Sequence, residues 1–127
     1  MSHFTTVQTQ MSDWQVLEAV LKQNGYTQIN NNVNVKDYYG NEVQVDWAVK
    51  VTEKHWVGFK QRADGYEVIA DFYNFPDAAK AFFSEQLLPE YSCAVIEQKL
   101  KYKSNALVSP RKKLADGTIQ ITVQYNS

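Results

Sequence analysis

Two aromatic-rich strand patterns joined by a tight turn constrain the fold of this chain more than any other feature. The first runs from Trp56 to Gln61 and the second from Tyr66 to Tyr73. The turn between them, Arg62 to Gly65, contains an Asp-Gly pair, and glycine supplies the positive backbone angle that a β-hairpin needs. Because both faces of the second strand carry apolar groups, we expect it to lie inside a sheet.

A strand, a helix and an irregular segment are predicted before this hairpin. The Thr-rich, β-branched segment from His3 to Thr9 suits a strand. Ser12 stands three residues before Gln15, which is the spacing of a helix-capping pair, and apolar residues follow at helical spacing until Gly25 ends the helix. The amide-rich segment Asn30 to Asn34 favours a short or irregular edge strand.

The clearest strand of the first half follows a turn at Gly40-Asn41. From Val43 to Val51, apolar and polar residues alternate with a period of nearly two, which predicts one buried face and one wet face. The residues expected on the buried face are Val43, Val45, Trp47, Val49 and Val51.

The second half reads as helices followed by a hairpin. A helical pattern opens at Pro76, and Pro89 is expected to end or kink it because proline cannot donate a backbone hydrogen bond. A second helix is predicted from Glu90 to Tyr102. Alternating residues from Leu107 to Leu114 and from Thr118 to Tyr125 flank another Asp-Gly turn and predict a final hairpin.

These patterns predict one domain, residues 1–127, of the α+β class: a mainly antiparallel sheet with the helices packed on one face. A helix followed by a hairpin occurs twice, from Ser12 to Val51 and from Glu90 to Tyr125. A duplication of ferredoxin-like βαββ units is therefore also consistent with the order.

Composition narrows the classes of function. Thirteen basic and fourteen acidic residues give a net charge of −1, which argues against a nucleic-acid partner held through phosphates. The single Cys93 excludes an internal disulfide and fits a reducing intracellular compartment. No run approaches the roughly 20 apolar residues that span a bilayer, so no membrane insertion is expected. No metal-ligand cluster, nucleophile constellation or phosphate loop stands out, so neither a cofactor nor a catalytic residue is predicted.

Two carboxylates in the second aromatic strand are the most informative site candidates. Glu67 and Asp71 lie four residues apart and share one face of the strand, with Ile69 between them. Burying such charges costs several kcal/mol unless they are paired, and Lys60 or Arg62 of the adjacent strand could supply the partner. The face is then either a binding or catalytic cleft, or simply a wet sheet surface.

Aromatic and basic residues complete the candidate binding surface. Rings on the face opposite the helices would form an exposed patch that suits a partner, and His3 could assist as part of a partner-binding strand. His55 could pair with Glu53, Cys93 reads as small core filler, and the run Arg111-Lys112-Lys113 is either a grip for an acidic surface or solvated edge protection. The residues proposed for the surface are Trp56, Tyr66, Tyr73, His3, Glu67, Asp71 and Lys60.

Several of these segments resemble a known family. The opening block Met1 to Thr9, the segment Trp56-Val57-Gly58-Phe59 and the strand Tyr66-Glu67-Val68-Ile69-Ala70-Asp71 are similar to the hypothetical chloroplast reading frame thirty-five family of cyanobacteria and plastids, a domain of unknown function. Where that family usually carries paired tryptophans, this chain has Phe72-Tyr73-Asn74. The resemblance implies a cyanobacterial cytoplasm, a plastid stroma or a phage-infected host as the location. It also suggests a protein partner related to redox chemistry or to a photosystem.

Three hypotheses follow. The leading one is a non-catalytic protein-interaction or assembly factor that uses an aromatic sheet face. The alternative is a small ligand-binding domain or enzyme in which Glu67 and Asp71 work beside Lys60 in a cleft. The third is a homo-oligomer that joins sheets edge to edge, which the polar segment Asn30 to Asn34 opposes at its own edge.

Overall fold

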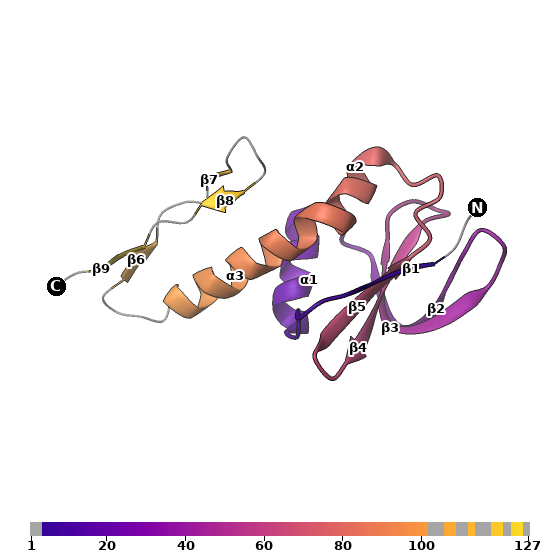
Figure 1. Cartoon of the computed structure of the whole chain (residues 1–127), viewed down its shortest axis with the longest axis horizontal. Coiled ribbons are helices and arrows are strands. Elements are labelled where there is room, and N and C mark those ends of the chain that lie inside the picture. Colours follow the sequence, from indigo (N-terminus) through magenta and orange to yellow (C-terminus); the bar gives the residue numbers. More distant parts are fainter. Residues whose placement is uncertain (1–3, 102–105, 109–111, 114–117, 121–122, 126–127) are drawn as a thin grey trace.

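A five-stranded antiparallel sheet forms the centre of the molecule (Figure 1). The computed structural model describes residues 4–101, 106–108, 112–113, 118–120 and 123–125. The strand order is β1-β5-β4-β3-β2, and every neighbouring pair is antiparallel. The strands are β1 (Thr5–Gln8), β2 (Ile29–Lys36), β3 (Glu42–Lys50), β4 (Trp56–Arg62) and β5 (Gly65–Ala70). Because the helices pack on one face of this sheet, the predicted α+β class is confirmed.

The predicted central hairpin is the pair β4–β5. Arg62 pairs with Gly65 at its turn. Gly65 has a φ of +152°, and a side chain there would collide with the backbone of Thr9 and Gln10, so the close approach of the chain requires glycine. All residues of β5 are buried. The prediction that this strand lies inside the sheet is therefore confirmed.

The main core lies between the sheet and the helices. Phe59 of β4 and Val68 of β5 pack beneath α1 (Trp14–Gln23) and the second helical segment. Trp14 stacks on Trp47, with ring centroids 4.4 Å apart and an interplanar angle of 7°. Phe59 is 0% exposed, and fully burying such a ring stabilises a fold by roughly 1.5–3 kcal/mol.

Helix α1 begins one residue later than the sequence predicts. The cap is Asp13 and not Ser12, because the Asp13 carboxylate accepts the backbone N–H groups of Gln15 and Val16. Ser12 lies before the cap, and its N–H donates to the Tyr91 hydroxyl at 3.1 Å. The helix ends as expected: Gly25 has a φ of +94°, and the N–H of Tyr26 donates back to the Leu21 carbonyl.

The second helical segment continues through Pro89, so Pro89 does not end the helix, which was one of the two outcomes that the sequence predicted. Helix α2 (Asp77–Ala81) runs through a π-helical segment, η1 (Phe82–Gln86), into α3 (Leu87–Lys101). In η1 the N–H of Leu87 donates to the carbonyl of Phe82, five residues back. This wider turn lies where the Pro89 ring would otherwise meet the carbonyl four residues earlier, and it lets the helix pass the proline.

Strand β3 does not keep one face buried along its length. Trp47 and Val49 belong to the helix-side core, whereas Val45 packs on the opposite face. The change occurs at Asp46, whose carboxylate accepts the N–H of Gln61 at 2.6 Å in place of a ladder bond. Opposite this point, Asn32 has a φ of +52°. The regular alternation predicted from Val43 to Val51 is therefore interrupted by a bend in both strands.

The final hairpin forms outside the main sheet. Strand β6 (Ala106–Val108) pairs with β9 (Val123–Tyr125), and β7 (Lys112–Lys113) pairs with β8 (Ile119–Gln120), both antiparallel as predicted. Within the described residues, neither ladder joins the five-stranded sheet. The two helix–hairpin units therefore differ, because the first contributes β2 and β3 to the main sheet and the second does not. The described strands do not form a duplicated βαββ fold.

Candidate functional site

The face of the sheet away from the helices carries the candidate site. Beyond the bend at Asn32 and Asp46, the β2–β3 hairpin curls back over this face. Val35 and Val45 then lie above Gly58, where an added methyl group would approach the Val45 Cγ1 to 2.6 Å. These residues form a second, smaller apolar cluster with Ala48 and Ile69. No helix contributes to it, and we call this surface the helix-free face.

Three tyrosines stand exposed at one end of this face. Tyr38 is 67%, Tyr39 63% and Tyr73 48% exposed. The ring of Tyr38 meets those of Tyr39 and Tyr73 edge to face, with centroids 5.4 Å and 5.1 Å apart. We call Tyr38, Tyr39 and Tyr73 the tyrosine cluster.

Two carboxylates hold the tyrosine cluster in place. Asp71 accepts the backbone N–H of Tyr38 at 2.8 Å and that of Tyr73 at 3.1 Å. Asp37 accepts the N–H groups of Tyr39 and Asn41, both at 2.9 Å. Asp71 thereby ties the tip of the β2–β3 hairpin to the chain after β5. The tyrosine rings are exposed, but the backbone that carries them is fixed.

A cavity of about 610 Å³ opens beside the tyrosine cluster. Trp56, Asp71, Tyr73 and Phe75 line it together with Lys36, Lys54 and His55. The sequence allowed an ion pair between His55 and Glu53, but the structure does not form it. The His55 Nδ1 is 2.6 Å from the Thr52 hydroxyl, its ring meets Phe75 edge to face, and Glu53 instead pairs with Lys50. The imidazole is thus held in the wall of the cavity by its own turn.

Glu67 and Asp71 do not meet in one cleft. Arg62 donates from Nε to Glu67 Oε1 at 3.0 Å, so Arg62 is the partner that the structure gives to this carboxylate. Lys60 lies opposite Glu67 in the strand register. Glu67 is 9% exposed and lies outside the lining of the cavity that contains Asp71. Their shared strand face does not bring the carboxylates together, because Ile69 is packed between them in the smaller cluster.

Tyr66 does not belong to the binding surface, although the sequence predicted it there. It is 5% exposed and packs in the helix-side core, against Trp14. Burial raises the pKa of its hydroxyl above the ordinary value of 10.0, and a hydrogen bond with Trp47 opposes this effect. The side chain faces the helices because it alternates with Glu67, so the strand period assigns it to the core.

The remaining candidates have different positions. Trp56 is half-buried on the helix-free face, and Cys93 is buried on α3, in agreement with its prediction as core filler. His3 and Arg111 lie outside the described residues, and Lys112 and Lys113 form the short strand β7. Trp56 and Tyr73 are therefore the predicted aromatic residues that do line the helix-free face.

Sequence reasoning missed Tyr38 and Tyr39. The signal was present, because two adjacent tyrosines stand before the Gly40-Asn41 turn, where large rings cannot both be buried at a hairpin tip. The amide-rich segment before these tyrosines predicts only a short or irregular edge strand, so the turn after it is not expected to form part of a site. The structure makes it an eight-residue strand, and its turn becomes part of the site.

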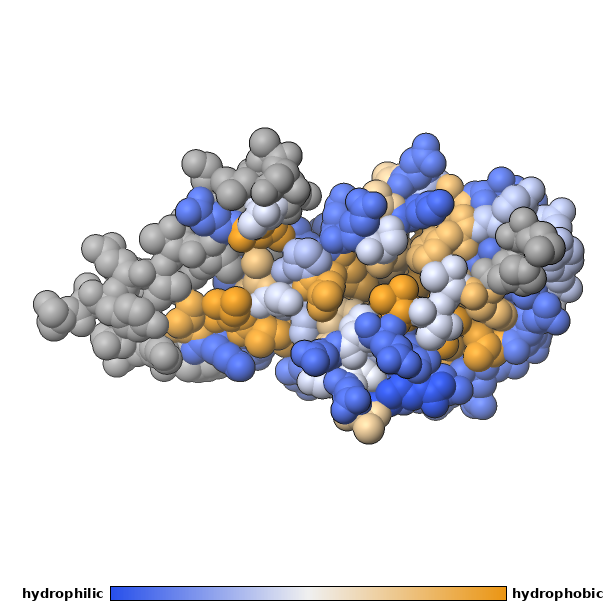
Figure 2. All heavy atoms as spheres, in the orientation of Figure 1, coloured by the Kyte–Doolittle hydropathy of each residue, from blue (hydrophilic) through white to orange (hydrophobic). Residues whose placement is uncertain are grey.

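A second apolar surface lies on the helix side of the molecule. Figure 2 shows hydrophobic atoms exposed along the path of α3. Leu88 is 49% and Ile96 47% exposed, and both line a groove of about 990 Å³ between α3 and the segment Gln8 to Ser12. This groove lacks a cluster of aromatic rings, although Tyr91 forms part of its wall.

In the described part of the chain, no three His, Cys, Asp or Glu residues come together in a way that could hold a metal ion. None of the helices in the same part has the length and apolar character to cross a membrane.

The fold and the site define a small α+β protein with a fixed aromatic surface on one sheet face. The chain belongs to the family described as protein of unknown function (DUF1257), whose profile matches residues 20–122. It is also similar to the uncharacterized protein ycf35 of Cyanophora paradoxa and to that of Pyropia yezoensis. Each is 28% identical over 127 residues, covering 98% of this chain and 97% of the relative. The resemblance drawn from the sequence is thereby confirmed, and the protein is of plastid and cyanobacterial type. No solved structure matches the chain.

Proposed function

We propose that this protein is a non-catalytic interaction or assembly factor that holds a protein partner against the tyrosine cluster. The observation that carries the proposal is the combination of exposure and order at this cluster. Three rings are about half exposed or more, yet Asp71 and Asp37 fix the backbone beneath them. Tyrosine gives large contact area at low entropic cost, and a preorganised surface loses little freedom on binding.

The chemistry of the two buried carboxylates favours this function over the enzyme alternative. Asp71 accepts two backbone N–H groups, and Glu67 is paired with Arg62. A general acid or base needs a carboxylate within hydrogen-bond reach of a substrate proton. Structural bonds already occupy these side chains, and Glu67 lies outside the cavity of about 610 Å³ that Asp71 lines, so the pair is better suited to stabilising the surface than to catalysis.

The location and partner class rest on the relatives. Because those relatives are ycf35 proteins, we place this protein in a cyanobacterial cytoplasm, a plastid stroma or a phage-infected host. A protein partner related to redox chemistry or to a photosystem fits that setting. The near-neutral net charge of −1 supports a protein rather than a nucleic acid as the partner.

Capture experiments with matched variants test the proposal. The full chain is immobilised and incubated with extract of a photosynthetic cell, and bound proteins are quantified. Tyr39→Ala/Tyr73→Ala removes exposed rings without touching the backbone bonds to Asp71. Leu88→Ala/Ile96→Ala removes a similar exposed apolar area from the α3 groove and is the control.

We expect the wild type to capture a discrete protein. The tyrosine variant should capture at least about tenfold less of it, because aromatic residues at the centre of an interface contribute much of its binding energy. The control variant should retain it. Equal capture by the wild type and the tyrosine variant, loss only in the control, or no captured protein at all would contradict the proposal.

A further inference from the structure

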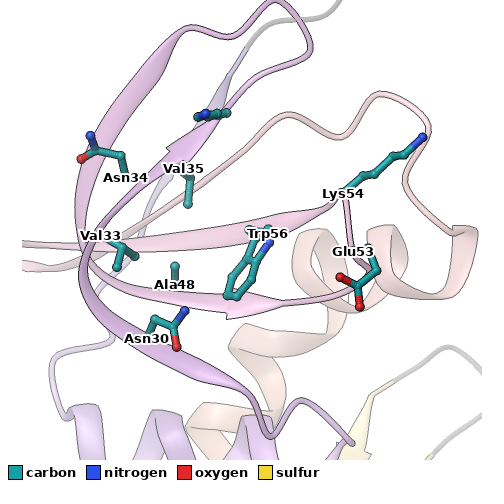
Figure 3. A pocket seen from close by; sticks show the side chains of 9 residues that line it. Asn30, Val33, Asn34, Val35, Ala48, Glu53, Lys54 and Trp56 are labelled. Carbon is teal, nitrogen blue, oxygen red and sulfur yellow. The ribbon is translucent and has the colours of Figure 1, made fainter.

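A slot that adjoins the cavity beside the tyrosine cluster lies under the curled β2–β3 hairpin (Figure 3). Its volume is about 320 Å³, at the lower end of the range of small-molecule sites. In the close view the Trp56 ring stands on one side and Val33 on the other, with Ala48 at the base between them and Val35 above. A gap bounded by an indole face and aliphatic side chains fits a flat ring better than a bulky group.

The small side chain at the base keeps the slot open. Ala48 is 1% exposed and lines the slot, so the base of the gap between Trp56 and Val33 is occupied by a single methyl group. The Asn30 amide points toward this base in Figure 3. It offers a hydrogen-bond donor beside the apolar walls.

The charges at the rim are predominantly positive. Lys36 and Lys54 both line the slot, together with one carboxylate, Glu53. Glu53 forms an exposed ion pair with Lys50 at 2.7 Å, so the rim carries two lysines against one carboxylate that already has a cationic neighbour. Lys36 makes only an exposed contact of 3.4 Å with Glu42, and such surface pairs contribute little. Lys54 makes no ion pair with the residues that the structure describes.

We propose that this slot binds a small flat anion, with its ring between Trp56 and the valines and its acidic group at the rim that Lys36 lines; Lys54, whose side chain extends away from the gap in Figure 3, adds positive charge to the same rim from farther away. An aromatic carboxylate or sulfonate is the chemical class. The ring would stack on the indole, and the lysines would supply the charge that the paired Glu53 does not oppose. This inference goes beyond the proposed function and does not depend on it: the cavity beside the tyrosine cluster shares Lys36, Lys54 and Trp56 with the slot, but Tyr38, Tyr39 and Tyr73 do not line the slot.

Titration with 2-naphthoate tests the inference on the full chain. The indole N–H signals of the three tryptophans are followed by NMR, because Trp14 and Trp47 stack together on the helix side and are internal controls. We expect a saturable shift at Trp56 and at the Asn30 side-chain amide. The uncharged 2-naphthamide and the cationic 2-naphthylmethylammonium should bind at least about fivefold more weakly, and acetate should give no shift.

Matched variants decide the assignment. Lys36→Glu/Lys54→Glu should weaken naphthoate binding by about tenfold or more, and Trp56→Leu should abolish it. Lys99→Glu, an exposed lysine on α3, should leave it unchanged, as should Tyr39→Ala/Tyr73→Ala. Circular dichroism checks that each variant is folded. Equal affinity for the naphthamide, no effect of the lysine reversal, shifts confined to Trp14 and Trp47, or no binding would overturn the inference.

Discussion

Asp71 links three parts of the helix-free face through one side chain. It follows β5, it accepts the N–H of Tyr38 from the hairpin tip, and it accepts the N–H of Tyr73 from its own turn. The sequence could identify Asp71 as a carboxylate in an awkward place, because burial of a charge needs compensation. It could not supply the partners, because one of them lies 33 positions away on a hairpin whose curl is a tertiary feature.

Replacing Asp71 tests its role as a clamp. Hydrogen bonds to charged groups contribute about 1.5–3 kcal/mol each, so Asp71→Ala should lower the free energy of unfolding by about 2–3 kcal/mol. Asp71→Asn keeps one acceptor oxygen and should cost about half as much. Urea unfolding measures both. Two variants with equal, small effects would show that the bonds contribute nothing to the fold.

Gly58 is required by close packing and not by its backbone angle. An added methyl group would meet Val45 Cγ1 at 2.6 Å and Val35 Cγ2 at 3.3 Å. Gly58→Ala should therefore lower the free energy of unfolding by about 1–3 kcal/mol, as overpacked sites do. The double variant Gly58→Ala/Val45→Ala should recover part of that loss. Additive effects of the two substitutions in a double-mutant cycle would mean that the hairpin does not rest on Gly58.

The free energy of unfolding should fall at alkaline pH because of two tyrosine hydroxyls, those of Tyr66 and Tyr26. Burial raises the pKa of its phenol above the ordinary value of 10.0, and burial does the same for Tyr26. Above pH 10.0 the unfolded chain loses these protons before the folded chain does. The two protonated phenols therefore contribute their full stabilisation of the fold below their pKa in the unfolded chain. This contribution is lost as the pH rises through their higher pKa in the folded chain.

The measurement is the urea midpoint at about pH 9 and about pH 11, where this linkage acts. The midpoint of the wild type should fall between the two values, and Tyr66→Phe, which has no phenol proton to lose, should fall less. Tyr26→Phe should also fall less than the wild type, for the same reason. A fall that is identical in all three proteins would assign the alkaline sensitivity to other groups.

The β2–β3 hairpin is the element that turns a sheet face into a site. Asn32 has a φ of +52° opposite the point where the Asp46 carboxylate replaces a ladder bond. The amide-rich composition of Asn30 to Asn34 predicted a short or irregular edge strand: β2 is an edge strand, but it is eight residues long, and Asn32 has the left-handed angle that asparagine tolerates. The direction of the bend depends on Gly58 and Asp46 elsewhere in the sheet, so a local pattern could not predict it.

Substitutions at Asn32 test this element. Asn32→Gly should leave the free energy of unfolding unchanged or raise it slightly, because glycine adopts positive φ without strain. Asn32→Val should lower it by about 1–2 kcal/mol and should alter the fluorescence of Trp56 beneath the hairpin, since a β-branched residue resists this angle. If the valine variant is as stable as the glycine variant, the left-handed angle does not hold the curl.

The sequence pattern predicted the central hairpin correctly but not the continuity of the second helical segment. The central hairpin was predictable because period two, an Asp-Gly turn and apolar faces agree over the same residues. The continuity of α2, η1 and α3 was not, because Pro89 breaks a regular helix and only a π turn relieves it. That turn is stabilised by packing of Phe82 and Phe83 in the core, which no local rule contains.

At the scale of the whole molecule, the sheet and its helix-side core were predictable and the site was predictable only in part. Trp56 and Tyr73 could be assigned to the helix-free face from strand period and composition. The tyrosine cluster and the slot arise from the fold of one hairpin over another, which depends on long-range packing. Sequence patterns report local periodicity, and a surface built by a bend and a distant carboxylate has no local period.

The arrangement of the chain also predicts which part of it carries the stability. Strands β1 to β5 and the helices share one core, whereas the described strands after Lys101 pair only with each other. A chain that ends at Lys101 should therefore unfold cooperatively, with a Tm within about 5 °C of the full chain, a shift of roughly 1 kcal/mol for a domain of this size. Differential scanning calorimetry measures both proteins. Loss of a cooperative transition in the shortened chain would show instead that the final hairpin is needed for the core, and the sheet could then not be treated as the independent folding unit that presents the tyrosine cluster.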